Sequence, residues 1–190
     1  MRGTNCIATW LLILCILPSC AVTRSGRSTV PISTVDRFIL QSPELGPALS
    51  AIQEITLEFP DGTREKFLSI VENDHKTLRI ALLNMLGQTL VVLSFSDGEV
   101  MVDPQGPIPA AVEPVRILGY LQIVLWPQSA VRSGLAGKLS LVESGGDLEI
   151  QDSHGPILLI EREGDCCPYS TTVITHNLEG WKIRIQTMVQ

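Results

Sequence analysis

The chain has 190 residues, of which 45% are hydrophobic and 18% charged, and this composition argues against an intrinsically disordered protein. The formal net charge is −6 and there is no run of Lys and Arg, which argues against nucleic-acid binding. The length suits one domain, and aromatic residues make up only 5% of the chain, so the core must be mostly aliphatic.

The N-terminus is typical of a cleaved secretory signal. Its apolar run, residues 7–17, is too short to span a bilayer, which takes about 20 apolar residues. The run ends in LPSC, residues 17–20, which resembles the lipobox of bacterial lipoproteins, although Pro18 departs from the usual pattern. In such proteins the peptide is cut before the cysteine, and the resemblance implies lipidation of Cys20. The alternative is an ordinary secretory signal in which Cys20 has no special role.

These features predict three segments. Residues 1–19 are a lipoprotein signal peptide, residues 20–34 are a small, polar and flexible tether, and residues 35–190 form the domain. In lipoproteins of this kind Ala21, rather than an aspartate, implies sorting to the outer membrane. Residues 35–51 hold either a short helix or a strand, and their prolines keep any helix short.

From residue 55 the hydrophobic pattern has the period of β-strands. Ile55, Leu57 and Phe59 alternate with polar residues up to the turn sequence PDGT, and further strands follow between the polar breaks ENDHK and SDGE. These runs predict an antiparallel meander. One of its turns, within LLNMLGQTL, carries Met85 and Leu86, two large apolar residues at a position that normally faces water.

A helical segment interrupts the strands. A proline-rich stretch leads into residues 115–126, whose apolar residues exceed a single stripe, so this helix is either buried on most sides or lies against a lipid-like surface. Residues 127–137 predict a second short helix, and strands then resume until the alternating run 181–187. The predicted class is therefore α+β, with an open antiparallel sheet and a central helical insert.

Catalytic motifs are not evident. His75, His154 and His176 occupy positions typical of solvated turns, and no two of them have the spacing of metal ligands. Cys166 and Cys167 are interpreted as loop residues, with a vicinal disulfide or a nucleophile paired with His176 as alternatives. The sequence thus predicts a protein that is not an enzyme and uses neither a cofactor nor a metal.

Aliphatic residues are in excess of what one sheet face requires. A curved antiparallel sheet crossed by a helix can enclose an apolar cavity that would hold acyl chains. The alternative, which the pattern does not exclude, is that helix and sheet pack directly and leave no cavity. The predicted lining residues are Leu78, Ile80, Leu82, Val92, Leu118, Leu121 and Leu125.

The lipobox, the segment LRIALLNMLGQTLVVLSFSDGEVMV, the helix ending YLQIVLWP and the closing NLEGWKIRIQ together resemble the LolB-type outer-membrane lipoproteins, over roughly residues 50–188. The resemblance is closer to a LolB-like branch of unassigned function within the LolA/LolB superfamily. It implies an open half-barrel closed by helices over an apolar cavity. It also implies that Leu86 matches a protruding leucine that assists membrane transfer, with Met85 in place of the usual proline.

From this resemblance we expect a monomer at the periplasmic face of the outer membrane. Its partners would be acyl chains of lipids or lipoproteins and a LolA-like periplasmic carrier. The resemblance leaves open whether the cargo is a lipoprotein or a polyene lipid. A short, proline-rich lid and few aromatic residues depart from the LolB pattern, so the alternative is a structural or assembly lipoprotein that binds a protein partner.

Overall fold

The computed structural model describes residues 28–109, 112–165 and 168–188. Most of this part of the chain is antiparallel β-structure. The strands of its main sheet are β3 (Leu49–Glu58), β4 (Arg64–Asn73), β5 (Leu78–Leu83), β6 (Thr89–Ser96), β7 (Glu99–Pro104), β8 (Ser140–Ser144), β9 (Asp147–Asp152), β10 (Gly155–Glu163), β11 (Thr171–His176) and β12 (Lys182–Met188). They form one ten-stranded sheet in the order β7-β6-β5-β4-β3-β12-β11-β10-β9-β8.

Each half of the sheet is a meander of hairpins, as the sequence predicts. The last strand joins the two halves because β12 pairs with β3, with Ile185 opposite Ile55 and Ile183 opposite Leu57. Two strand groups around a helical insert are therefore confirmed, and the sheet is open because β7 and β8 do not pair.

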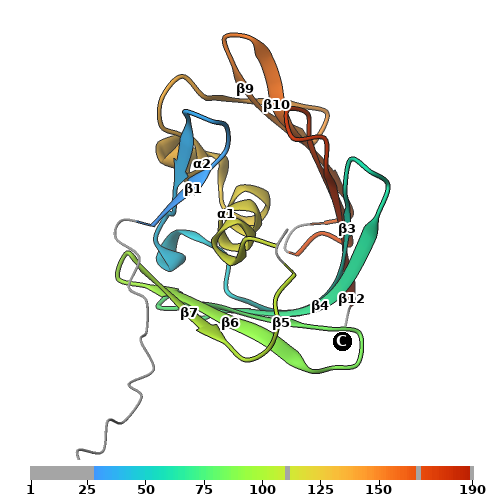
Figure 1. Ribbon diagram of the computed structural model, residues 1–190. Coiled ribbons are helices and arrows are strands. Elements are labelled where there is room, and N and C mark those ends of the chain that lie inside the picture. The colour runs from blue at the N-terminus through green and yellow to red at the C-terminus, as the bar shows by residue number, and fades with distance from the viewer. Residues whose placement is uncertain (1–27, 110–111, 166–167, 189–190) are drawn as a thin grey trace, which may run out of the picture.

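The sheet curves around helix α1 (Pro114–Leu125), which lies inside the curve (Figure 1). Pro114 occupies the first helical turn, where its missing N–H leaves no hydrogen bond unmade. All eight residues from Leu118 to Leu125 are buried, which shows that the helix is surrounded by protein on every side over its last two turns. Helix α2 (Gln128–Gly134) follows it directly.

A hairpin from the N-terminal segment covers the side of α1 that the sheet leaves open. It consists of β1 (Thr29–Pro31) and β2 (Arg37–Ile39), and the one-turn 3-10 helix η1 (Pro43–Leu45) follows. Val30 contacts α1 at Gly119, where a Cβ atom would come within 2.7 Å of a Val30 methyl carbon.

This hairpin corrects the predicted tether. Residues 29–34 were assigned to a flexible segment, yet Val30 and Ile32 have no exposed surface. The buried amide of Gln122 fixes α1 to the chain after β2, because it accepts from Gln41 N at 2.8 Å and donates to Gln41 O at 2.9 Å. Most residues of this segment are small and polar, so the sequence pattern did not indicate that Val30 and Ile32 are buried.

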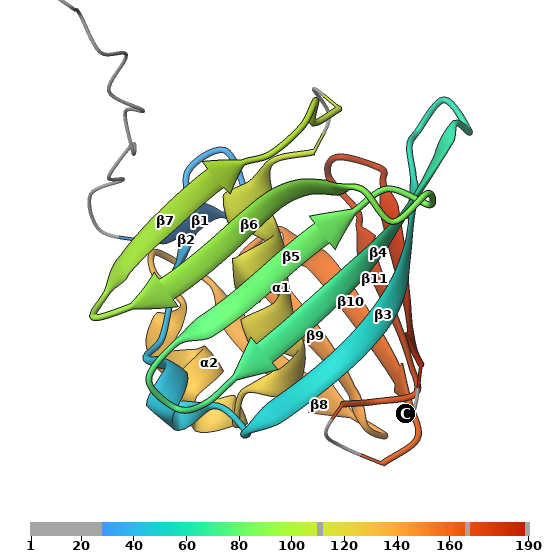
Figure 2. The ribbon, with the colours of Figure 1, turned by 90° about the horizontal axis from the view of Figure 1, so that it is seen from below.

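The turns divide between the two ends of the strands (Figure 2). We call one the mouth end; it holds turns 32–36, 59–63, 84–88, 153–154 and 177–181. The other, the far end, holds turns 74–77, 97–98 and 145–146. The described chain begins at the far end, where the hydroxyl of Ser28 donates to Gly98 O at 2.6 Å. No helix among the described residues has the length and apolar character needed to cross a membrane.

Candidate binding cavity and apolar turns

A small apolar hollow lies between α1 and the concave face of the sheet. Its volume is about 70 Å³, roughly half that of an engineered cavity that binds benzene. Side chains from five strands and α1 surround it, among them Ile55, Phe67, Ile80, Leu82, Leu121 and Ile185. Because α1 itself fills most of the space inside the sheet, this inner hollow is narrow.

A second hollow of about 290 Å³ continues from the first toward the mouth end. The two share Leu57, Val112, Ile117, Tyr120 and Ile183 as lining residues, so they adjoin each other. The outer hollow adds charged groups, because Glu113, Arg116 and Glu179 border it. An apolar interior therefore opens through a polar rim.

Three of the predicted lining residues, Ile80, Leu82 and Leu121, line the inner hollow. Leu78 and Leu118 are fully buried in the surrounding core, and Leu125 borders a separate depression near Trp126.

Val92 was assigned to the wrong face of the sheet. It pairs with Ala81 and points away from α1, whereas its neighbours Val91 and Leu93 are fully buried. The strand is apolar on both faces, so alternation alone does not identify the inner one.

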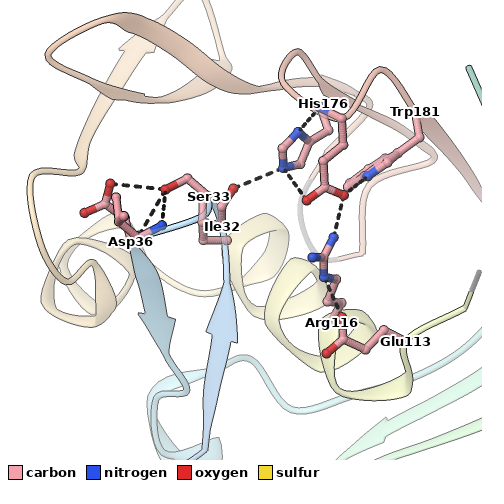
Figure 3. A network of polar contacts seen from close by, with 9 residues as sticks. Ile32, Ser33, Asp36, Glu113, Arg116, His176 and Trp181 are labelled. Atoms are coloured by element: carbon pink, nitrogen blue, oxygen red, sulfur yellow. Dashed lines mark hydrogen bonds and ion pairs between the residues drawn. The ribbon is translucent and has the colours of Figure 1, made fainter.

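The rim is an ion-pair cluster that joins α1 to the β11–β12 turn (Figure 3). Arg116 Nη1 lies 2.6 Å from Glu179 Oε2, and Arg116 Nε lies 2.8 Å from Glu113 Oε2. Trp181 Nε1 donates to the same Glu179 oxygen at 2.7 Å. Although burial opposes it, the hydrogen bonds from Arg116 and Trp181 lower the pKa of Glu179, which keeps this carboxylate ionised.

His176 lies behind this cluster and is completely buried, contrary to the expectation of a solvated turn histidine. Its Nε2 donates to Ile32 O at 3.0 Å, and its Nδ1 accepts from Glu179 N at 3.1 Å. Both contacts suit the neutral ring. Burial lowers the pKa of His176, against the opposing charge of Glu179, so the histidine connects the β1–β2 turn to the β11–β12 turn without carrying charge.

Two buried hydroxyls face the hollow with no acceptor for their protons among the described residues. Tyr120, only 4% exposed, borders both hollows, and Ser69, 1% exposed, borders the inner one. The Tyr120 ring packs on Trp181 with centroids 5.3 Å apart. Burial raises the pKa of Tyr120, with the charge of Arg116 opposing, so its hydroxyl keeps its proton.

Met85 and Leu86 protrude into solvent at the mouth end. Leu86 is 85% exposed and Met85 49%, while Asn84 Oδ1 holds the turn by accepting from the amides of Leu86 and Gln88 at 3.0 Å each. Val35, 81% exposed, and Leu178, 63% exposed, occupy the β1–β2 and β11–β12 turns of the same end. The three most exposed large hydrophobic side chains of the described residues therefore lie at the mouth end.

Sequence reasoning missed the rim residues Arg116, Tyr120 and Glu179. Arg116 lies in α1 and Glu179 in the β11–β12 turn, and their separation of 63 positions in the chain hides their contact. One usable signal was the scarcity of aromatic residues, since a Tyr on the helix and a Trp directly before the last strand stand out in so aliphatic a chain. Cys20, Cys166 and Cys167 lie outside the described residues.

A family model described as "Protein of unknown function (DUF3261)" matches residues 50–189. The chain belongs to the DUF3261 family. The match covers the ten-stranded sheet almost completely and both helices, so the cavity, its rim and the turn carrying Leu86 all lie within the DUF3261 domain. The β1–β2 hairpin precedes it. A comparison with curated proteins gives no match.

Proposed function

We propose that this DUF3261 protein is a non-enzymatic lipoprotein that binds acyl chains and passes them to or from a membrane. In this proposal Cys20 anchors it at the periplasmic face of the outer membrane. The observation that carries the proposal is positional. Leu86, Val35 and Leu178 project from the mouth end, where the path to the apolar hollow opens.

Insertion into lipid would bury the exposed apolar side chains at this end and so stabilise a membrane-bound state. Complete burial of a leucine side chain is worth about 1.5–3 kcal/mol, and a bilayer can supply that burial without a fold change. A surface that inserts beside the mouth would shorten the path an acyl chain travels through water. Transfer would then run down an affinity gradient, because the membrane binds acyl chains strongly.

The resemblance to LolB-type proteins supports the same proposal. The segment Asn84–Thr89 corresponds to the loop with the protruding leucine, and the open antiparallel sheet curved around a helix is compatible with a half-barrel. The cargo in this proposal is a lipoprotein or another acylated lipid, polyene lipids included. A LolA-like carrier would deliver it.

Vesicle flotation tests the membrane contact. Because every described element lies between Thr29 and Met188, protein lacking residues 1–20 retains the described fold and removes the contribution of the lipid anchor. Leu86→Glu should reduce flotation about tenfold or more. Leu45→Glu is the matched control, since Leu45 is 49% exposed but lies in η1 near the far end.

The outcome is decided by the contrast between these two variants. Equal flotation of wild type, Leu86→Glu and Leu45→Glu would show that the mouth end does not contact membranes. Unfolding of Leu86→Glu, checked by circular dichroism, would show that Leu86 belongs to the core instead. Mass spectrometry of ligands extracted from the wild-type protein should find recurrent acyl species, and a reproducibly empty protein would contradict acyl binding.

The narrowness of the inner hollow favours a second candidate function. A volume of about 70 Å³ leaves little room beside α1, and a lipoprotein that holds a protein partner needs no cavity. The exposed turns would then form a protein-binding surface. Capture of one stoichiometric protein partner that Leu86→Glu abolishes, together with absence of bound lipid, would favour this assembly role.

A further inference from the structure

We propose that the cavity recognises the uncharged carbonyl of an acyl ester or amide, held at the junction of the two hollows by the hydroxyl of Tyr120. The inference rests on the proposed acyl-chain binding and specifies the ligand class: a neutral acyl derivative rather than a free fatty acid or a phosphate-bearing head.

The first support is an unused donor. The Tyr120 hydroxyl is buried, and no atom among the described residues accepts its proton. Arg116 makes a side-chain hydrogen bond with this hydroxyl, but a guanidinium carries only donors, so it cannot accept the tyrosine proton. A buried donor without an acceptor costs about 1–3 kcal/mol, and a ligand carbonyl would recover part of this cost.

The second support is position. Tyr120 borders both hollows, so an acyl chain in the inner hollow places the group at its head beside the hydroxyl. The ring is held by Trp181, which is itself fixed by its hydrogen bond to Glu179. The donor is therefore preorganised at the point where the lining changes from apolar to polar.

The third support is charge. Arg116 is paired with both Glu113 and Glu179, and the three groups carry a formal sum of −1. The nearby His176 adds no charge, because burial keeps it neutral. Among the described residues that line the two hollows, no cation is left over to bind an anionic head, and a carboxylate or phosphate would meet net repulsion. A neutral carbonyl accepts from Tyr120 without this penalty.

The size of the inner hollow sets the mode of binding. About 70 Å³ takes the end of a chain, and a longer chain requires α1 to move away from the sheet. Medium-length probes are therefore suited to the test: methyl decanoate as ester, decanoate as acid and decane as a chain without a head.

The experiment measures displacement of the neutral fluorescent probe N-phenyl-1-naphthylamine from protein lacking residues 1–20. The wild type should bind methyl decanoate more tightly than decanoate or decane. Tyr120→Phe should weaken ester binding about 3- to 10-fold, the effect of one hydrogen bond, and leave decane binding unchanged. Ser69→Ala is the matched control, since it removes the other buried hydroxyl that lacks an acceptor and should leave the ester-to-decane ratio unchanged.

The results separate the two proposals. Binding of the probe and decane with no ester preference, or an ester preference that survives Tyr120→Phe, would overturn the carbonyl site but leave acyl binding standing. Tighter binding of decanoate than of its ester would overturn it as well. Failure of the probe and all three ligands to bind would overturn both.

Discussion

Strand β5 has a turn at each end. Both turns are held by a side-chain oxygen that accepts from two backbone amides, but their exposed side chains are polar in one turn and apolar in the other. At the far end Asp74 Oδ1 accepts from the amides of Lys76 and Thr77 at 2.9 and 2.8 Å. At the mouth end Asn84 Oδ1 accepts from two amides in the same manner. Each turn also contains one residue with positive φ, His75 at 69° and Gly87 at 79°.

The residues between the capping groups differ completely. The far-end turn carries His75 and Lys76, as expected for a water-facing bend, whereas the mouth-end turn carries Met85 and Leu86. Turn formation requires only the capping side chain and the residue with positive φ. The apolar pair is therefore not explained by the local backbone structure of the turn.

The largest expected effect comes from exchanging one residue between the two turns. The double variant Leu86→Lys with Lys76→Leu keeps composition and net charge constant and moves the apolar side chain to the far end. Vesicle flotation should fall about tenfold or more, because the transplanted leucine lies far from Val35 and Leu178. Flotation equal to that of the wild type would show that position is irrelevant and that any exposed leucine suffices.

Removal of a cap tests whether the two turns are structurally equivalent. Asn84→Ala should lower the free energy of unfolding by about 1 kcal/mol, because two turn amides lose their acceptor. Asp74→Ala should lower it in the same direction, and Asn84→Asp should restore most of the loss. Urea denaturation measures these changes. A much larger loss for Asn84→Ala would indicate that the mouth-end turn packs on the core.

Two histidines, His75 in the far-end turn and His176 at the end of β11, extend the comparison to pH. In the folded state burial lowers the pKa of His176 below its ordinary value near 6.5, so the unfolded chain binds this proton more readily. Its contribution to stability is complete above pH 6.5 and declines as the pH falls through the folded-state pKa. His176→Gln should therefore flatten the decline in melting temperature between pH 7 and 5.

The exposed His75 supplies the control for this measurement. His75→Asn keeps a residue that tolerates positive φ and shows how the removal of an exposed histidine alone affects the melting temperature. Profiles that coincide for His176→Gln and the wild type would contradict a neutral buried histidine. The charged groups that face His176 are Glu179 and Arg116, and both variants retain them.

The smallest expected effect concerns acid titration of the capping groups. Backbone amides, first of Thr77 and then of Lys76, lower the pKa of Asp74, so its support of the turn is present above the ordinary value of 3.8 and lost as pH falls through the lowered value. The NMR amide shift of Thr77 should titrate below pH 3.8, whereas that of Leu86 should not follow it, because Asn84 carries no ionisable group.

Elements with strong periodicity could be predicted from sequence. The hairpin turns PDGT, SDGE and NLEG fall between strands, the helix predicted over 115–126 is α1, and the alternating run 181–187 forms the closing strand β12. Met85 and Leu86 stood out because they violate a local rule, and the structure places both in solvent. Features of this kind depend on neighbours in sequence, which the chain itself displays.

Features that depend on distant neighbours could not be predicted in this way. Val92 was assigned to the wrong face because its strand, β6, is apolar on both faces. In addition, the pairing of β5 with β6 shifts register between Leu82 and Leu83, and as a result the consecutive residues Leu90 and Val91 are both buried. His176 is buried by a turn 144 residues earlier in the chain. The rim of the cavity likewise forms only when the sheet brings the β11–β12 turn to the start of α1.

The contact between Ser28 and Gly98 limits how an anchored protein can be oriented. With Cys20 as the anchor, eight residue steps to Ser28 reach at most about 29 Å, while β6, the strand between the Gly98 turn and the Leu86 turn, spans seven steps or about 24 Å. An upright domain with Leu86 in the bilayer that holds Cys20 would therefore use nearly the full reach of this segment. A domain inclined on that surface, or a mouth that faces away from it toward an incoming carrier, needs less.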